Sequence, residues 1–428
     1  MAPVRPNLLF CTDFRMARAV RERYAMTATT PGLSWGSELA RIAAKLSAAQ
    51  DMHSLLHTAT FQIRQVFNAG VAIFTQTTDE PVFAVAASVG IPKDEIWPAR
   101  FRFDSAVAAS LERPSHAADL DLPEEEREAL RLARAVLLVP LRRRDTLLGF
   151  LGLGQNPMGP RYDEGELALL DALASNIALC YENFRLREQA FELQRVREIQ
   201  ERLLPMAPPK LGTGIEIAHY WRPARAVSGD YFDAIDLGGG KSGVCVADVI
   251  GKGMPAALLM SNVQAAVRAV ASDSMPPSEL CARVNRVLAG NLAPGNFVTM
   301  FYSVFDAEAR NLTYTNAGHC APVLVRQNGE VRRLESGGAL LGVFRNWAFE
   351  EQQLKLEPGD RFVLFTDGVT ELKDSSEEEF GEERLEHLLQ SCRTEDVQGI
   401  KRRVLEAISN FNAGEYQDDV TVVVIAVD

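Results

Sequence analysis

The stretch VCVADVIGKGMPAA, residues 244–257, decides the fold of the C-terminal half of the chain. It places Asp248 at the edge of a valine-rich run, shortly before Gly251 and Gly253. Aspartate is unfavourable inside a strand, so an aspartate at this place needs a reason. A turn or a helix cap is the commonest reason, and it would be sufficient for Asp248 alone.

Three further acidic clusters flank apolar runs in the same half. A turn or a helix cap could explain any one of the four clusters, but it is a poor explanation for all four together. These clusters are SGDYFD (228–233), FTDG (365–368) and QDDVT (417–421). Carboxylate oxygens suit Mg²⁺ or Mn²⁺, and no His/Cys set competes as a softer metal site. Two such ions would hold a phosphate and activate a water, so no protein nucleophile is required. The motifs of P-loop enzymes, kinases and cysteine phosphatases do not occur in the sequence.

Seven motifs in a fixed order carry a specific resemblance. They are EIQERLLP (198–205), SGDYFD (228–233), ADVIGKGMPAA (247–257), FVTMFYSVFD (297–306), NAGHCAP (316–322), TDGVTE (366–371) and DDVTVVVI (418–425). This series resembles the stage II sporulation protein E branch of the PPM, or type 2C, bacterial phosphatases, over about residues 195–428. The resemblance implies an α-β-β-α sandwich with two Mn²⁺ or Mg²⁺ ions between its sheets. It also implies hydrolysis of phosphoserine or phosphothreonine on a protein, typically a STAS-type anti-sigma-factor antagonist in a partner-switching pathway.

The same resemblance implies a role for each motif aspartate. Asp248 would bridge both ions, and the backbone carbonyl of Val249 would bind one of them. Asp230 would serve that second ion directly or through water. Asp367 and Asp419 would complete the site of the first ion.

Other motif positions are expected to support the site without binding metal. Asp233 and Asp418 would orient a ligand or a water, or cap a turn. Lys252 would face solvent or contact phosphate. Asn316 and His319 suggest a general acid, but the sequence around them reads as two strands about a glycine turn, so we expect a structural role. Three glycines would allow close backbone approach or positive φ beside the metals: Gly229, Gly251 and Gly368.

The N-terminal half has a helix–strand–helix order. The expected elements are two helices, two strands, a hairpin and a further helix, at residues 39–46, 55–66, 71–75, 82–86 and 135–153 and from Asp163. With its hairpin VPLRRRDTLLGFLGL (139–153), this half resembles a GAF domain, a small α/β sensory module, over roughly residues 35–180. An unspecified α/β scaffold is the alternative. A small-molecule ligand is possible there, and its identity stays open.

A continuous helical pattern connects the two halves. Its apolar positions are spaced 4, 3, 3, 3 and 4 residues apart: Leu186, Ala190, Leu193, Val196, Ile199 and Leu203. This spacing is close to that of a coiled coil, so we expect a homodimer through this helix. A helix packed on its own domain is the alternative. Pro205 ends the helix.

The whole chain is consistent with this division. Its 428 residues favour two domains, and we expect an α/β multi-domain protein: a poorly ordered extension (1–33), a GAF-like sensor (34–180), a helical linker (181–206) and a PPM-type phosphatase (207–428). The net charge of −12 argues against nucleic acid and anionic membranes as partners, because both would be repelled. Six scattered cysteines indicate reduced thiols and a cytoplasmic protein. No apolar run has the length of a membrane span or of a secretory signal.

Two other function classes are compatible with these residues. One is a phosphatase-like module that binds a phosphoprotein without hydrolysing it, with the GAF-like half as the functional sensor. The other is a scaffold that only dimerises. The presence of every acidic motif position favours the enzyme.

Overall fold

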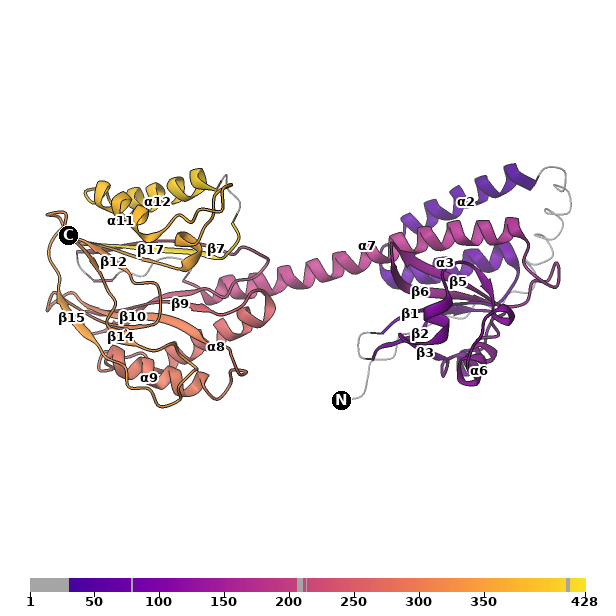
Figure 1. Cartoon of the computed structure of the whole chain (residues 1–428), viewed down its shortest axis with the longest axis horizontal. Coiled ribbons are helices and arrows are strands. Elements are labelled where there is room, and N and C mark those ends of the chain that lie inside the picture. The colour runs from indigo at the N-terminus through magenta and orange to yellow at the C-terminus, as the bar shows by residue number, and fades with distance from the viewer. Residues whose placement is uncertain (1–30, 78–79, 206–210, 213, 413–415) are drawn as a thin grey trace. The chain divides into compact units, whose positions relative to one another are not determined.

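The computed structural model describes residues 31–77, 80–205, 211–212, 214–412 and 416–428, with only the backbone for residues 31–34. The chain consists of two compact units, Met1–Ala190 and Phe191–Asp428 (Figure 1). The extension predicted for residues 1–33 lies largely outside the described residues. Helix α2 (Pro31–Ser47) begins before the predicted domain boundary at residue 34.

Among the described residues of the N-terminal unit, six strands form one antiparallel sheet in the order β3-β2-β1-β6-β5-β4. The strands are β1 Val71–Gln76, β2 Val82–Val89, β3 Arg100–Arg102, β4 Ser115–His116, β5 Leu137–Arg143 and β6 Thr146–Leu153. The predicted hairpin is β5–β6, paired from Leu137↔Leu153 to Arg143↔Thr146. The two predicted single strands are β1 and β2.

Helices cover both faces of this sheet. On one face lie α2, α3 (Met52–Phe67) and the first part of α7 (Glu164–Leu203), whose apolar residues share one core with the sheet. The other face carries α4 (Lys93–Ile96), α5 (Ala106–Ser110), the 3-10 turn η1 (Ala117–Asp119) and α6 (Glu124–Leu132), around a second core. The predicted helices are thus present, and α7 begins beside Asp163 as expected.

The C-terminal unit, in the part that the structure describes, has two facing sheets. Their orders are β14-β11-β10-β9-β8, with β15 also paired to β11, and β13-β12-β16-β17-β7. The strands are β7 Ile215–Arg222, β8 Tyr231–Gly238, β9 Lys241–Val249, β10 Val298–Asp306, β11 Asn311–Ala317, β12 Val323–Val325, β13 Val331–Arg333, β14 Gly337–Gly338, β15 Gln352–Lys355, β16 Arg361–Phe365 and β17 Val420–Val427.

Helices cover the outer face of each sheet, which completes the predicted α-β-β-α sandwich (Figure 1). Helices α8 (Met254–Val270) and α9 (Pro277–Leu288) pack on the first sheet. Helices α11 (Glu382–Ser391) and α12 (Val397–Phe411) pack on the second, and the short α10 (Asp367–Thr370) follows β16. Within the described residues, no helix has the length and apolarity to cross a membrane.

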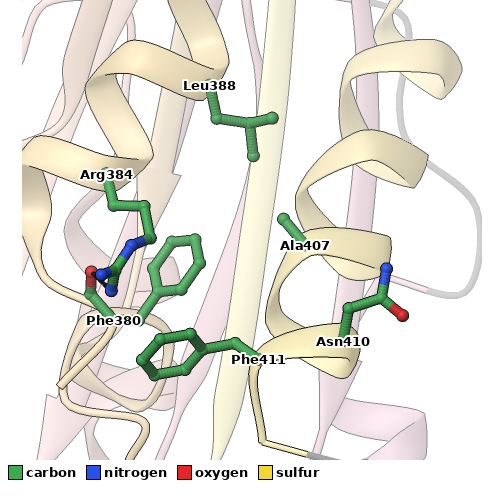
Figure 2. Close-up of a pocket in the computed structure, with 6 residues that line it drawn as sticks. All are labelled: Phe380, Arg384, Leu388, Ala407, Asn410 and Phe411. Carbon is green, nitrogen blue, oxygen red and sulfur yellow. Dashed lines mark hydrogen bonds between the residues drawn. The ribbon is translucent and has the colours of Figure 1, made fainter. Parts of the chain in front are cut away.

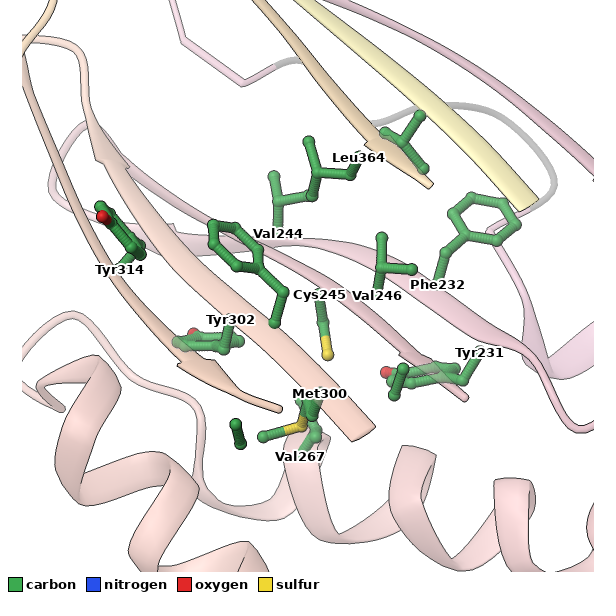
Figure 3. Close-up of a cluster of buried hydrophobic side chains, with 14 of the residues drawn as sticks. Tyr231, Phe232, Val244, Cys245, Val246, Val267, Met300, Tyr302, Tyr314 and Leu364 are labelled. Carbon is green, nitrogen blue, oxygen red and sulfur yellow. The ribbon is translucent and has the colours of Figure 1, made fainter. Parts of the chain in front are cut away.

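Strand β17 is apolar throughout because both of its faces are covered. In β17 every residue is buried: Val423 and Ile425 face the core between the sheets, whereas Val422 and Val424 face α11 and α12. Strand β9 alternates in the same way. Figure 3 shows Val244 and Val246 of β9 directed toward Leu364 of the opposite sheet, and Cys245 directed toward α8.

One predicted turn connects the two sheets. The sequence TYTNAGHCAPVLV forms two strands about Gly318, as predicted, and Gly318 has a φ of +70°. The two strands, β11 and β12, belong to different sheets and do not pair with each other. The turn therefore carries the chain from one layer of the sandwich to the other.

Candidate metal centre

Strand ends bring the four motif aspartates together from both sheets. In the first sheet, Asp230 directly precedes β8 and Asp248 lies one residue from the end of β9. In the second, Asp367 follows β16 after Thr366, and Asp419 directly precedes β17. The two pairs meet because Thr366 donates a hydrogen bond across the sandwich to Asp230, at 2.8 Å.

Asp230 is the most enclosed member of this group, at 1% exposure. Its Oδ2 accepts hydrogen bonds from Thr366 Oγ1 and, at 2.5 Å, from Thr421 Oγ1. Burial, and then the nearby Asp248 carboxylate, raise the pKa of Asp230 well above its ordinary value. The two hydroxyls oppose this rise, because they stabilise the ionised form.

Asp248 and Asp367 are half-buried carboxyl groups that lie near other acidic side chains. Burial, followed by the charges of Asp367 and Asp418, raises the pKa of Asp248 to about 7. Burial, followed by Asp418, raises the pKa of Asp367 to about 6. Lys252 forms its ion pair with Asp418, at 2.7 Å. A group of buried and half-buried carboxylates with raised pKa values is the environment in which divalent cations replace protons, so these residues fit Mg²⁺ or Mn²⁺.

The carboxylate of Asp419 accepts hydrogen bonds from two backbone N–H groups. Its Oδ1 accepts the N–H of Ala224 at 2.7 Å, and its Oδ2 accepts the N–H of Gly229 at 2.8 Å. Each carboxylate oxygen keeps a second lone pair for a further partner. In the described part of the chain, no three Asp, Glu, His or Cys side chains converge as a ready-made ligand set.

Asp233 anchors a helix. Its carboxylate receives two hydrogen bonds from Arg268 of α8, at 2.7 and 2.9 Å, and one from the hydroxyl of Tyr231, at 2.7 Å. It also accepts the N–H of Ala234. Neither predicted role, orienting a ligand or water or capping a turn, included this half-buried ion pair, which fixes α8 under the first sheet.

Asp418 and Lys252 form a pair at the rim of the centre. Lys252 Nζ also donates to the carbonyl of Gln417, at 2.9 Å, and its side chain is 39% exposed. Asp418 Oδ1 accepts the N–H of Asp419, so it caps this turn as expected. Lys252 is half-exposed, as predicted, but it is held by the chain and does not extend freely into solvent.

His319 and Asn316 have the structural role that was expected. His319 is 6% exposed, and its Nδ1 lies 2.8 Å from Thr299 Oγ1. Asn316 Oδ1 accepts the N–H of His319, and its Nδ2 donates to the carbonyls of His319 and Leu334. Burial lowers the pKa of His319 to about 4, so the ring is neutral at pH 7 and has no proton to give as an imidazolium.

The three motif glycines are required by their surroundings. A Cβ on Gly229 would lie 2.9 Å from the carbonyl oxygen of Val249, and a Cβ on Gly368 would lie 1.9 Å from that of Asp419. Each glycine therefore lies too close to the backbone of a residue of the centre for a side chain to fit. Gly251 has a φ of +100°, a conformation that other residues rarely adopt.

Sequence reasoning missed several residues of this centre. Thr366 and Thr421 lie inside recognised motifs, next to the aspartates, and their hydroxyls were a usable signal. Arg268 lies in none of the motifs, so nothing in the sequence pairs it with Asp233. Gln200, in the motif EIQERLLP, was assigned only to the linker helix, yet it binds the backbone of Ser228.

Two pockets lie away from the metal centre. One, of about 320 Å³, lies between α11 and α12, where Arg384 stacks on Phe411 (Figure 2). It contains no carboxylate, so it offers no metal ligand. The other, of about 830 Å³, lies in the N-terminal unit, and Arg127, Arg131 and Arg134 line it together with apolar residues such as Leu122.

Comparisons with known proteins agree with this architecture. The family model of stage II sporulation protein E (SpoIIE) matches residues 238–428, and a GAF domain model matches residues 51–183. The chain is 30% identical over 236 residues to the phosphoserine phosphatase RsbU of Bacillus subtilis, across 55% of this chain and 69% of that protein. It is 30% identical over 264 residues to protein IcfG of Synechocystis sp., across 55% of this chain and only 41% of that protein.

A solved structure shows the same fold as the C-terminal unit. The SiaA-PP2C domain of Pseudomonas aeruginosa matches with a TM-score of 0.51 and 21% identity, over 57% of this chain and 99% of that domain. The two sheets, the order of the motifs and the extent of similarity to RsbU lead to one assignment. The chain belongs to the stage II sporulation protein E (SpoIIE) family of PPM-type phosphatases and carries an N-terminal GAF domain.

Proposed function

We propose that this protein is a metal-dependent protein serine/threonine phosphatase. The observation that carries the proposal is the group of four aspartates at the strand ends of the two sheets, two buried and two half-buried, with the pKa of Asp248 raised to about 7. Two bound Mn²⁺ or Mg²⁺ ions would supply Lewis-acid stabilisation of the phosphate and an activated water. Similarity to a protein named phosphoserine phosphatase supports the same reaction.

The proposed ligands are the five positions that the family resemblance implies. These are Asp230, Asp248, the carbonyl of Val249, Asp367 and Asp419. The chain's own contribution is to hold them: two threonine hydroxyls fix Asp230, and two backbone N–H groups fix Asp419. Outer contacts of this kind orient ligands and raise metal affinity.

The substrate we propose is a phosphoserine or phosphothreonine on a regulatory protein, of the STAS-type anti-sigma-factor antagonist class. Control would come from the GAF domain through α7. The apolar seam of that helix supports a homodimer, because Leu186 and Ile199 are 57% and 60% exposed in the single chain. The arginine-lined pocket of about 830 Å³ is the place we propose for a small-molecule ligand of the GAF domain.

Phosphate release from a phosphoserine peptide tests the proposal. The full-length protein would be assayed with Mn²⁺ and with EDTA, beside Asp248→Asn, Asp367→Asn and the control Asp273→Asn. Asp273 is an exposed aspartate between α8 and α9, outside the metal centre. We expect turnover that requires Mn²⁺, is lost in the first two variants and is kept in the control. Binding of a phosphoprotein without turnover would instead favour the non-catalytic binding module.

A further inference from the structure

The end of helix α7 docks on the C-terminal unit through a polar residue. Within residues 191–203, all of which the structure describes, Gln200 is the one buried position, at 2% exposure. Leu204, four residues later, is also buried and belongs to the core of the sandwich. A buried amide needs hydrogen-bond partners, so the partners of Gln200 decide where this helix sits.

Those partners are the two backbone groups of one residue. Gln200 Nε2 donates to the carbonyl of Ser228 at 2.7 Å, and Gln200 Oε1 accepts the N–H of Ser228 at 3.0 Å. Ser228 itself is fully buried, so water cannot replace these contacts. The side chain of Gln200 thus pairs with Ser228 as a neighbouring strand would.

Ser228 begins the turn that presents the proposed ligands. Its Oγ accepts the N–H of Asp230 at 3.0 Å. The next residue, Gly229, donates its N–H to Asp419 and passes so close to the Val249 carbonyl that no side chain fits. Gln200 therefore binds the backbone of Ser228, and Asp419 binds the backbone of the next residue, Gly229.

We propose that Gln200 is a positioning residue for the metal centre. By fixing both backbone groups of Ser228, it sets the height of Gly229 over the Val249 carbonyl and the direction of Asp230. Without these two bonds the turn would be free to shift, and the proposed ligands would lose their register. The inference rests on the proposed metal-dependent function, but it concerns ion binding, which is measurable without substrate.

The variant that isolates this role is Gln200→Met in the full-length protein. Methionine keeps the length and volume of glutamine and removes both hydrogen bonds. Gln200→Glu is the second variant, since it keeps the acceptor for the Ser228 N–H and loses the donor. Gln194→Met is the matched control, because Gln194 lies on the same helix with an exposed side chain.

Three quantities would be measured for the wild type and for each variant. Electron paramagnetic resonance of free Mn²⁺ gives the binding affinity, phosphate release gives the Mn²⁺ dependence of kcat, and thermal melting in EDTA reports on the fold. We expect both Gln200 variants to bind Mn²⁺ about 10-fold more weakly or worse, as outer-shell contacts do. Excess Mn²⁺ should restore most of the turnover in Gln200→Met, and Gln194→Met should behave as wild type.

The outcomes separate this inference from the proposed function. Wild-type Mn²⁺ affinity in both Gln200 variants, or equal weakening in Gln194→Met, would overturn the positioning role while leaving the phosphatase intact. Weakened Mn²⁺ binding together with no turnover in the wild type would support the positioning role and reject the enzyme. A fall in the EDTA melting temperature without any change in Mn²⁺ affinity would show that Gln200 only docks the helix, and would overturn the inference.

Discussion

Replacing Arg268 by methionine removes the cation that faces a buried carboxylate. Arg268 binds Asp233 through two hydrogen bonds, and the Asp233 side chain is 0% exposed whereas that of Arg268 is 49% exposed. In Arg268→Met, Asp233 keeps the Tyr231 hydroxyl and loses its charge partner. The carboxylate would then be buried with hydrogen-bond donors but without an opposite charge, which is costly.

The size of the effect follows from this asymmetry. Breaking a buried pair by removing one partner costs about 3–5 kcal/mol. Because the arginine is half-exposed, solvent screens part of the interaction, and we expect about 2–3 kcal/mol. For a unit of this size, about 1 kcal/mol corresponds to roughly 2–4 °C, so the melting temperature of the C-terminal unit should fall by roughly 5–10 °C.

Thermal melting of the full-length protein, followed by near-UV circular dichroism, measures this change. Arg283→Met is the matched control, because Arg283 pairs with Glu279 on the surface of α9 and both side chains are 46% exposed. That control should stay within about 0.5 kcal/mol of wild type. Asp233→Asn in the Arg268→Met background should recover much of the loss. A melting temperature for Arg268→Met within 1 °C, about the experimental error, of Arg283→Met would refute the reasoning.

Three further predictions concern the metal centre and the linker. In EDTA, the melting temperature should fall as the pH rises from 6.5 to 8, because the pKa of Asp248 is raised to about 7 in the folded chain and its ionisation there is unfavourable. His319 acts in the opposite direction near pH 6.5, because its pKa is about 4 in the folded chain and 6.5 when the chain is unfolded. Asp248→Asn should therefore abolish or reverse the fall in melting temperature, and added Mn²⁺ should also remove it. Thr421→Val, which loses a hydroxyl that binds Asp230, should weaken Mn²⁺ binding about 10-fold in a calorimetric titration, and wild-type affinity would contradict it. Ile199→Glu should convert the proposed dimer to a monomer in sedimentation analysis, and an unchanged mass would argue against the seam.

Much of the fold could be predicted from the sequence, because hydrophobic periodicity and turn residues are local features. The four aspartates lie where apolar runs begin or end, and the structure places each of them at or beside a strand end, as at Asp248 and Asp419. The hairpin β5–β6 was readable because alternating apolar residues flank a short polar turn. Period and turn chemistry act over a few residues, so the sequence displays them directly.

The contacts that were missed join residues far apart in the chain. Gln200 and Ser228 are 28 positions apart, and Asp233 and Arg268 are 35 apart. Alternation in β11 and β12 shows that both are strands, but it carries no information about which sheet each joins. Pairings of this kind depend on packing across the whole unit, which a single sequence does not display.

The number of Mn²⁺ ions bound per chain tests the central claim most directly. Isothermal titration of the ion-free full-length protein, at pH 7.5, would be compared with Asp248→Asn. The account predicts two ions for the wild type and loss of tight binding at both sites in Asp248→Asn, since this carboxylate is the proposed bridge. A wild-type protein that binds no Mn²⁺, or an Asp248→Asn variant that binds both ions as tightly as wild type, would contradict it.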